Sequence, residues 1–153
     1  SHASRAVGDA IRMAALTGLR RGELLNLQPE DRQNGAVTLR DTKNGRPRVI
    51  PLPPEAEKIR LPIGLSTDGL EWGFREARRK AGLHAVRFHD LRHTYASWLV
   101  QSGSSLTVVR DLLGHSSLAV TSRYAHLAHD HLKEAIKGLP RGLATRLATK
   151  KRR

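Results

Sequence analysis

The chain has 153 residues, which is enough for one domain with a single hydrophobic core. Its 27 Lys and Arg residues against 14 Asp and Glu give a formal charge of +13, which predicts a polyanionic partner. Nucleic acid is favoured over a membrane surface because the basic residues are spread along the chain. The absence of cysteine excludes disulfides, thiolate metal sites and a cysteine nucleophile. We find no signal peptide and no run of 18 apolar residues, so we expect a cytoplasmic protein without a membrane partner.

Helical spacing of apolar residues marks the first part of the chain. Ser4 is a candidate cap for a helix whose stop is supplied by Gly18. A second short helix, "RRGELLNL", is expected to end before Pro29. Two helices with a tight connection are therefore predicted before the pattern changes.

The next segment, "GAVTLRDTKNGRPRVIPL", has the features of a β-hairpin. Residues 36–40 and 48–52 are predicted as strands, and the Asn44-Gly45 pair between them is typical of a two-residue turn. Lys43 lies beside this turn. A small antiparallel sheet is therefore expected.

From Pro53 onward the pattern is helical again. Thr67 or Asp68 begins one helix that Gly82 ends, and the later helical segments are "HDLRHTYASWLVQSG", "SSLTVVRDLLG", "SLAVTSRY" and "HDHLKEAIKGL". The predicted fold class is mainly α with a small antiparallel β-sheet (α+β). We expect one domain over residues 1–140 and a basic C-terminal tail over 141–153.

The stretch "FHDLRHTY" brings together His89, Arg92 and His93, which share a helix face at spacings of three and four residues. It superficially resembles the H-E-x-x-H zinc helix. However, Arg92 stays positively charged beside the expected cation, and Asp90 is shorter than the glutamate of that motif. We therefore expect no metal. A guanidinium beside imidazoles suits a phosphate instead.

A neighbouring stripe of the same helix is apolar and is expected to anchor it in the core, so that the site face and the buried face are distinct. The stripe consists of Leu91, Tyr95, Trp98 and Leu99.

Other candidate residues have ordinary interpretations when taken singly. Arg20 and Arg21 follow a helix stop in "TGLRRGEL", and a solvated surface cation is the simple explanation for either. Lys43 lies in a turn, where solvated lysines are common. His115 follows a glycine in "LLGHSS", and Tyr124 lies in "TSRYAHL". Only the combination and order of these residues favour a shared site.

In that order the residues resemble the catalytic domain of the tyrosine recombinase, or phage integrase, family, from about Ala14 to Leu127. The contexts that carry the resemblance are "ALTGLRRGELLNL", "TKNGRPRVIPL", "HDLRHTYAS", "LLGHSS" and "TSRYAHL". The resemblance implies a mainly helical catalytic domain with a small antiparallel sheet, without metal or other cofactor. It implies the catalytic residues Arg20, Lys43, His89, Arg92, His115 and Tyr124.

The resemblance also implies a role for each of these residues. Tyr124 would attack a phosphate of double-stranded DNA held by Arg20 and Arg92, giving a 3′-phosphotyrosyl intermediate. His89 would accept the tyrosine proton, and Lys43 would protonate the leaving oxygen. His115 would hydrogen-bond the phosphate in the transition state.

Two further residues belong to the same contexts. Glu23 matches an acidic position of the family and orients Arg20 or lies on the helix surface as an ordinary residue. For His93 a structural hydrogen bond is favoured over a chemical role.

The resemblance predicts a site-specific recombinase, first of all the integrase of a prophage or mobile element. A chromosome-dimer resolving recombinase or an inversion enzyme uses the same residues, and a type IB topoisomerase uses similar chemistry. A basic DNA-binding module without catalysis is the non-enzymatic alternative, and a zinc hydrolase is the remaining one.

The resemblance further predicts a homo-tetramer on DNA through exchange of a C-terminal helix, in a bacterial protein associated with the nucleoid. A helix that packs on its own domain is the alternative. The apolar residues of that segment are Leu127, Leu132, Ala135, Ile136 and Leu139. The family's N-terminal core-binding domain is expected to be absent from this chain, so that salt-sensitive DNA binding with weak sequence selectivity is predicted.

Overall fold

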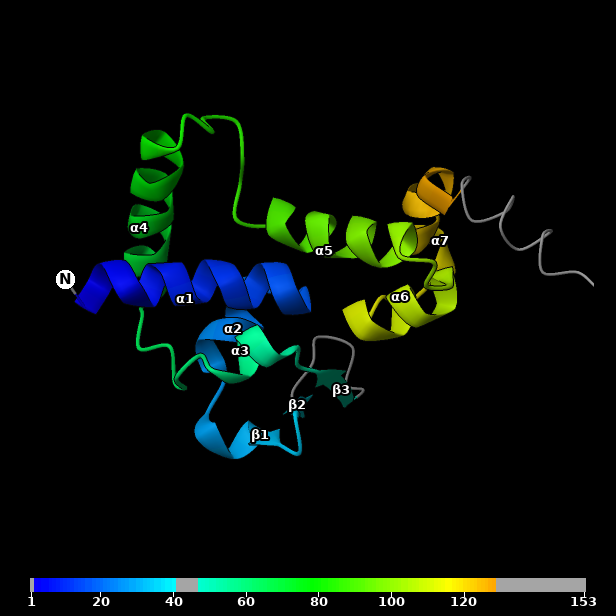
Figure 1. Cartoon of the computed structure of the whole chain (residues 1–153), viewed down its shortest axis with the longest axis horizontal. Coiled ribbons are helices and arrows are strands. Elements are labelled where there is room, and N and C mark those ends of the chain that lie inside the picture. The colour runs from blue at the N-terminus through cyan, green and yellow to red at the C-terminus, as the bar shows by residue number, and fades with distance from the viewer. Residues whose placement is uncertain (1, 41–46, 129–153) are drawn as a thin grey trace, which may run out of the picture.

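Helix α1 (His2–Thr17) is the axis around which the other elements are arranged (Figure 1). The computed structural model describes residues 2–40 and 47–128. The remaining elements are α2 (Arg21–Asn26), η1 (Pro29–Asp31), β1 (Arg32–Gln33), β2 (Ala36–Leu39), β3 (Arg48–Pro51), α3 (Pro54–Glu57), α4 (Thr67–Lys80), α5 (Asp90–Gln101), α6 (Leu106–Leu113), α7 (Leu118–Thr121) and η2 (Ser122–Ala128). The predicted fold class, mainly helical with a small antiparallel sheet, is confirmed. Within the described ranges, each helix is too short or too polar to cross a membrane.

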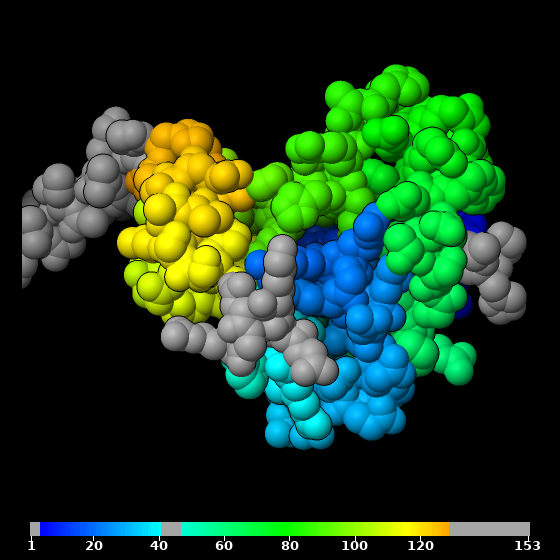
Figure 2. Space-filling model, turned by 180° about the vertical axis from the view of Figure 1, so that it is seen from behind, coloured from blue at the N-terminus to red at the C-terminus, as the bar shows by residue number. Residues whose placement is uncertain are grey.

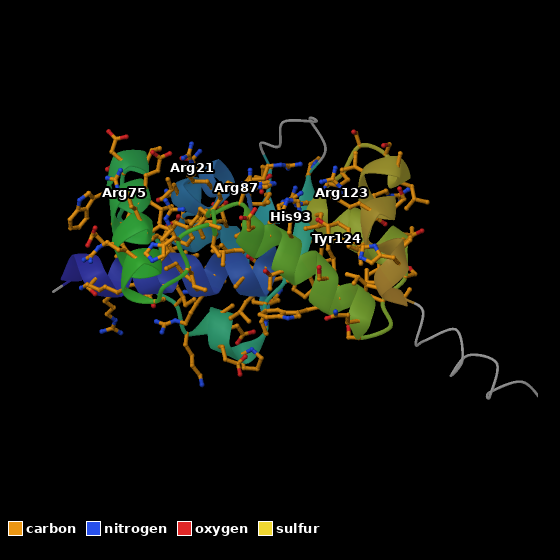
Figure 3. The ribbon with its side chains drawn as sticks, turned by 90° about the horizontal axis from the view of Figure 1, so that it is seen from above. Arg21, Arg75, Arg87, His93, Arg123 and Tyr124 are labelled. Atoms are coloured by element: carbon orange, nitrogen blue, oxygen red, sulfur yellow. The ribbon has the colours of Figure 1, made fainter. Side chains whose placement is uncertain are left out.

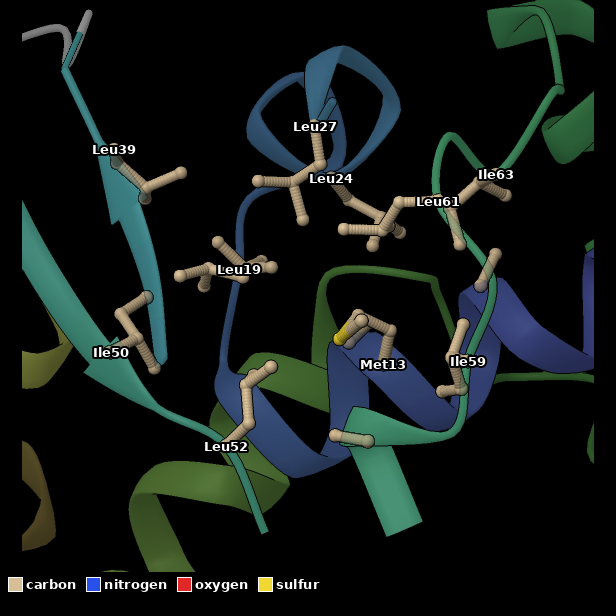
Figure 4. Packing of buried hydrophobic residues seen from close by; sticks show 14 of the residues in the cluster. Met13, Leu19, Leu24, Leu27, Leu39, Ile50, Leu52, Ile59, Leu61 and Ile63 are labelled. Carbon is tan, nitrogen blue, oxygen red and sulfur yellow. The ribbon is translucent and has the colours of Figure 1, made fainter. Parts of the chain in front are cut away.

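The first hydrophobic core lies where α1, α2 and the sheet meet. Helix α1 buries one face because its apolar residues recur at helical spacing, and Met13 and Ala14 are almost completely enclosed. Leu19 and Leu24 meet them from the α1–α2 connection and α2, and Ile50 meets them from the sheet (Figure 4). Helix α4 crosses the N-terminal part of α1, and α5 packs beside its C-terminal part (Figure 1).

Helix α1 ends where the sequence predicted, but it begins earlier. Gly18 has a φ of +64°, and its N–H donates to the carbonyl of Ala14 at 2.9 Å, which closes the helix. The predicted N-cap at Ser4 is wrong, since the helix already includes His2. A serine within the first turn of a helix satisfies the cap pattern equally well, so the pattern alone does not locate the helix start.

The sheet is antiparallel in the order β1-β2-β3, and Val37 pairs with Ile50 across the two longer strands. Alternate residues of β3 point inward, so Arg48 and Ile50 are buried while Val49 is exposed. Strand β1 is an addition that the sequence did not predict, because two residues are too short for a periodic pattern. The predicted turn at Asn44-Gly45, with Lys43 beside it, lies outside the described residues.

A second hydrophobic core joins α5, α6 and η2. Tyr95 and Val100 of α5 pack with Val109 and Leu113 of α6 and with Tyr124 of η2. The prediction that Trp98 anchors α5 in the core is wrong, since its side chain is 52% exposed. Helix α5 is rotated so that Arg92 lies on the buried side, which also contradicts the predicted separation of a site face from a buried face.

The close approach at Gly18 yields a stability prediction. A Cβ on Gly18 would lie 2.4 Å from Tyr95 Cδ1. Residue 18 also has a positive φ, a backbone conformation that residues with a side chain rarely adopt. Gly18→Ala should therefore lower the free energy of unfolding by about 2–4 kcal/mol. Gly8→Ala, within α1, is the matched control, because a Cβ on residue 8 would have no neighbour within 4 Å. This substitution should be neutral or slightly stabilising. Urea unfolding of both variants measures the difference, and equal stabilities would contradict it.

Candidate active site

Arg92 lies at the centre of the site and is 3% exposed. Its Nη1 donates to the Gly18 carbonyl at 2.6 Å, and its Nη2 donates to the Leu113 carbonyl. These acceptors lie at the C-terminal ends of α1 and α6, where helix carbonyls carry partial negative charge. Burial, and after it the charges of Arg20 and Arg48, lower the pKa of Arg92 to about 10, so the guanidinium is protonated at neutral pH.

Arg20 is placed beside Arg92 by the start of α2 and by Glu23. The Arg20 backbone N–H donates to Glu23 Oε2 at 2.8 Å, and Arg20 Nη1 donates to Glu23 Oε1 at 2.8 Å. Its Nη2 donates to the Gly114 carbonyl at 3.3 Å, so a third carbonyl from a helix end faces this cluster. Of the two neighbouring arginines, Arg20 faces the cluster, whereas Arg21 is exposed and paired with Glu71.

Arg48 is a site residue that the sequence reasoning missed. Its Nη2 donates to Glu23 Oε2 at 2.7 Å, so one carboxylate holds two guanidinium groups. Within the described part of the chain, Nε and Nη1 of Arg48 are buried without a hydrogen-bond partner. The carboxylate of Glu23 is therefore the group that compensates the buried charge of Arg48. The alternation of "RVIPL" would have indicated Arg48, since it shares the inner face of β3 with Ile50.

The charge of this cluster suits an anion. Three guanidinium groups, from Arg20, Arg48 and Arg92, surround one carboxylate, which leaves an excess of two positive charges. Burial alone would raise the pKa of Glu23, but the Arg20 backbone N–H and the Arg48 charge outweigh it and lower that pKa. The carboxylate is therefore ionised at neutral pH, and the cluster remains positive.

His115 follows α6 and faces the same cluster. Burial, and after it the charges of Arg92 and Arg20, lower its pKa to about 4, so the imidazole is neutral at pH 7. Its Nδ1 lies 2.9 Å from the hydroxyl of the buried Thr121. When Thr121 donates this bond, the ring proton is on Nε2, which leaves that nitrogen as a donor. No pattern in the sequence indicated Thr121, since a threonine within a short helix is commonplace.

Tyr124 of η2 lies against α5 and is 6% exposed. Its hydroxyl is 2.5 Å from Nδ1 of His93, and the His93 ring contacts the His89 ring edge-on at a centroid distance of 5.0 Å. Figure 3 shows Tyr124 and His93 side by side. Burial raises the pKa of Tyr124, and the charges of Arg123 and Arg92 oppose that rise.

The structure thus brings five of the six predicted site residues into one neighbourhood. Arg92 and Arg20 lie close enough to His115 for their charges to lower its pKa, the charge of Arg20 also lowers the pKa of Arg92, and His89 and Tyr124 join them through His93 and Arg92. The sixth, Lys43, lies outside the described residues. His89 is at the N-cap of α5 in a helical conformation, so it precedes the helix and does not lie within it.

The zinc interpretation of "HDLRH" has little geometric support. Asp90, the acid of that motif, accepts hydrogen bonds from the backbone and side chain of Arg87. His93 faces Tyr124 with one ring nitrogen, and Arg92 lies buried on the same helix. Over residues 2–40 and 47–128, no three histidine or acidic side chains gather as a metal ion would require.

A cleft of about 650 Å³ adjoins the site at Arg20 and His89. Its apolar lining includes Phe74 and Phe88, whose rings meet edge-to-face with centroids 5.3 Å apart. Arginines line it as well, and in Figure 3 three of them follow one another from α4 toward His93. They are Arg75, Arg21 and Arg87. In Figure 2 the surface is hollowed between two lobes. One is formed by α6, α7 and η2 (yellow to orange), and the other contains α4 (green).

Comparison with known proteins identifies the family to which this fold and site belong. The profile of the family described as "Phage integrase family" matches residues 64–131. The tyrosine recombinase XerA of Pyrococcus furiosus is 35% identical over 144 residues, covering 79% of this chain and 50% of that protein. The integrase of Salmonella phage P22 is 51% identical over 61 residues, or 40% of this chain and 16% of that protein.

Among solved structures, the catalytic domain of bacteriophage HP1 integrase superposes with a TM-score of 0.71 at 26% identity, covering 94% of this chain and 93% of that domain. The chain belongs to the phage integrase, or tyrosine recombinase, family, and its fold is that of the family's catalytic domain. The family assignment and fold predicted from the sequence are confirmed. The chain spans half or less of the length of the curated relatives described above.

Glu23 yields a prediction on stability and its pH dependence. Glu23→Gln removes the charge that compensates the buried Arg48, so the free energy of unfolding at neutral pH should fall by about 3 kcal/mol. The folded-state pKa of Glu23 is lowered, so this contribution is present above the unfolded pKa and is lost as pH falls through the folded value. The difference between wild type and variant should therefore shrink in acid.

Denaturant unfolding at several pH values measures that difference. Glu76→Gln makes the same chemical change in an exposed pair with Arg79 and should leave stability nearly unchanged. An equal loss in the two variants would contradict the role assigned to Glu23.

Proposed function

We propose that this chain is the catalytic part of a site-specific DNA recombinase that cuts and rejoins DNA through a 3′-phosphotyrosyl intermediate. The observation that carries the proposal is a positively charged pair, the half-buried Arg20 and the buried Arg92, in the same cluster as the hydroxyl of Tyr124. The nucleophile and the anion site belong to one chain. The names of the relatives, which are integrases and recombinases, agree with it.

The chemistry assigns a distinct task to each group. A phenol with a pKa near 10 is about one part in a thousand ionised at pH 7, a cost of roughly 4 kcal/mol. Arg20 and Arg92 offset that cost by binding the phosphate and stabilising the charge that develops on it. As the bond from Tyr124 Oη to phosphorus forms, the bond from phosphorus to the 5′ oxygen breaks, and the energy of the phosphodiester is retained for rejoining.

The remaining steps are proton transfers and hydrogen bonds. We assign to Lys43 the proton for the leaving 5′ oxygen, and to His89 the proton that Tyr124 releases. His115, neutral at pH 7, donates a hydrogen bond to the phosphate from Nε2 while Thr121 holds its other nitrogen. No metal and no nucleotide enters these steps.

Covalent trapping tests the proposed activity. A nicked duplex that loses a short fragment after cleavage should accumulate a covalent protein–DNA adduct with the wild-type chain, in the presence of a chelator. Tyr124→Phe should abolish the adduct and leave DNA binding intact, because only the nucleophilic oxygen is removed.

Since the target sequence is unknown, a pool of nicked duplexes with randomised sequence is the substrate. Binding without adduct would favour a non-catalytic DNA-binding module, and loss of activity with chelator would favour zinc.

The arginine-lined cleft is proposed to hold DNA phosphates next to the one that is cleaved. Arg75 is exposed in this cleft. The logarithm of DNA affinity should fall with the logarithm of salt concentration, and Arg75→Gln should make that slope shallower by about 0.9 if one phosphate contact is lost. Arg60→Gln is the control, since that exposed arginine lines a different hollow, with Arg5 and Pro62. Equal slopes for both variants would contradict the assignment.

Assembly and biological role extend the same proposal. We infer that four copies assemble on DNA by exchange of the apolar segment that ends at Leu139, most of which lies outside the described residues. The similarity to the P22 integrase favours integration of a prophage or another mobile element over chromosome-dimer resolution, although XerA is also a relative. A protein with this activity would be found at the bacterial nucleoid, in the cytoplasm.

A further inference from the structure

His93 contacts the reacting atom of the proposed nucleophile, and none of the roles assigned above uses it. Its Nδ1 lies 2.5 Å from the Tyr124 hydroxyl, within hydrogen-bond distance. The two rings lie 6.1 Å apart at an interplanar angle of 43°. The hydroxyl of Tyr124 is thus held by a side chain of α5.

This bond fixes which way the hydroxyl points. When the ring proton of the neutral imidazole is on Nε2, Nδ1 accepts from the phenol, so that the phenol proton is directed at His93 and the oxygen lone pairs are directed elsewhere. The phenol ring is buried, so rotation about the C–O bond is its main remaining freedom. The hydrogen bond to His93 removes that freedom.

Burial and the charges around His93 favour the neutral ring, which has one nitrogen able to accept a hydrogen bond. Burial lowers its pKa, Asp90 of the same helix opposes this, and Arg123 of η2, Arg87 before α5 and Arg92 of α5 lower it further. His89 also faces the ring, edge-on. At neutral pH the ring is therefore uncharged and can accept the tyrosine proton in a hydrogen bond.

The two histidines occupy different positions relative to the nucleophile. His89 lies at the N-cap of α5 and lines the arginine-rich cleft. His93 lies one turn further along and is hydrogen-bonded to the Tyr124 hydroxyl. This contact thus places His93, and not His89, next to the atom that must attack.

We propose that His93 is a positioning residue that accepts a hydrogen bond from Tyr124 through Nδ1 and so aligns the nucleophilic oxygen with the bound phosphate. This inference rests on the proposed recombinase activity. It is separate from proton transfer by His89, since alignment needs only an acceptor at the position of Nδ1.

A pair of substitutions separates this role from a structural one. In His93→Asn the amide reaches the position of Nδ1, so an acceptor for Tyr124 is retained. In His93→Gln the amide reaches the position of Nε2, so that acceptor is lost. The rate constant of adduct formation at saturating DNA should fall by about tenfold to a hundredfold in His93→Gln and by no more than about threefold in His93→Asn.

The affinity for the nicked duplex should be unchanged in both variants, because the phosphate is held by other residues. His84→Gln, in the exposed loop between α4 and α5, is the control and should react at the wild-type rate. A wild-type rate in His93→Gln would overturn the proposal, and so would an equal fall in the two variants.

A spectroscopic measurement covers the case in which a variant does not fold or no duplex reacts. In the DNA-free chain, the ¹⁵N resonance of His93 Nδ1 should shift in Tyr124→Phe, which removes the hydroxyl alone. An unchanged resonance would overturn the inference. If the resonance shifts but the wild-type chain forms no adduct on any duplex, the proposed function fails while the contact stands.

Discussion

The buried guanidinium of Arg92 is the interaction on which the site depends. It binds the carbonyl of Gly18 after α1 and the carbonyl of Leu113 at the end of α6, and so ties together the first and second hydrophobic cores. Helix C-termini present unpaired carbonyls with partial negative charge, and a buried cation needs such acceptors. These two hydrogen bonds satisfy the helix-end carbonyls and the buried cation together.

This mode of binding leaves the positive charge of Arg92 uncancelled. Had a carboxylate held Arg92, the pair would be neutral and an anion would gain little from the pocket. Carbonyls satisfy the N–H groups without supplying a full negative charge, and Glu23 is shared between Arg20 and Arg48. The pocket is therefore rigid and still positive, which is what the binding of a phosphate requires.

The elements around the pocket differ in how predictable they were. The ends of α1 and α6 followed from Gly18 and Gly114, which take the left-handed conformation that stops a helix. The orientation of α5 did not follow, because an apolar Trp98 and a charged Arg92 indicate the opposite face to the one that is buried. Packing against α1 and α6 decided that orientation, since only there do the carbonyl acceptors for Arg92 lie.

Residue types and local spacings could be read from the order of amino acids alone: helical periodicity, glycine stops, the alternation of the strands, and an order of Arg, His and Tyr that indicated the family. Which groups meet depends on how the elements pack. The bond from Arg92 to Gly18 spans 74 positions, and its acceptor is a backbone carbonyl, which every residue has and no letter of the sequence distinguishes. For the same reason the contact between His93 and Tyr124 was invisible until α5 and η2 were packed together.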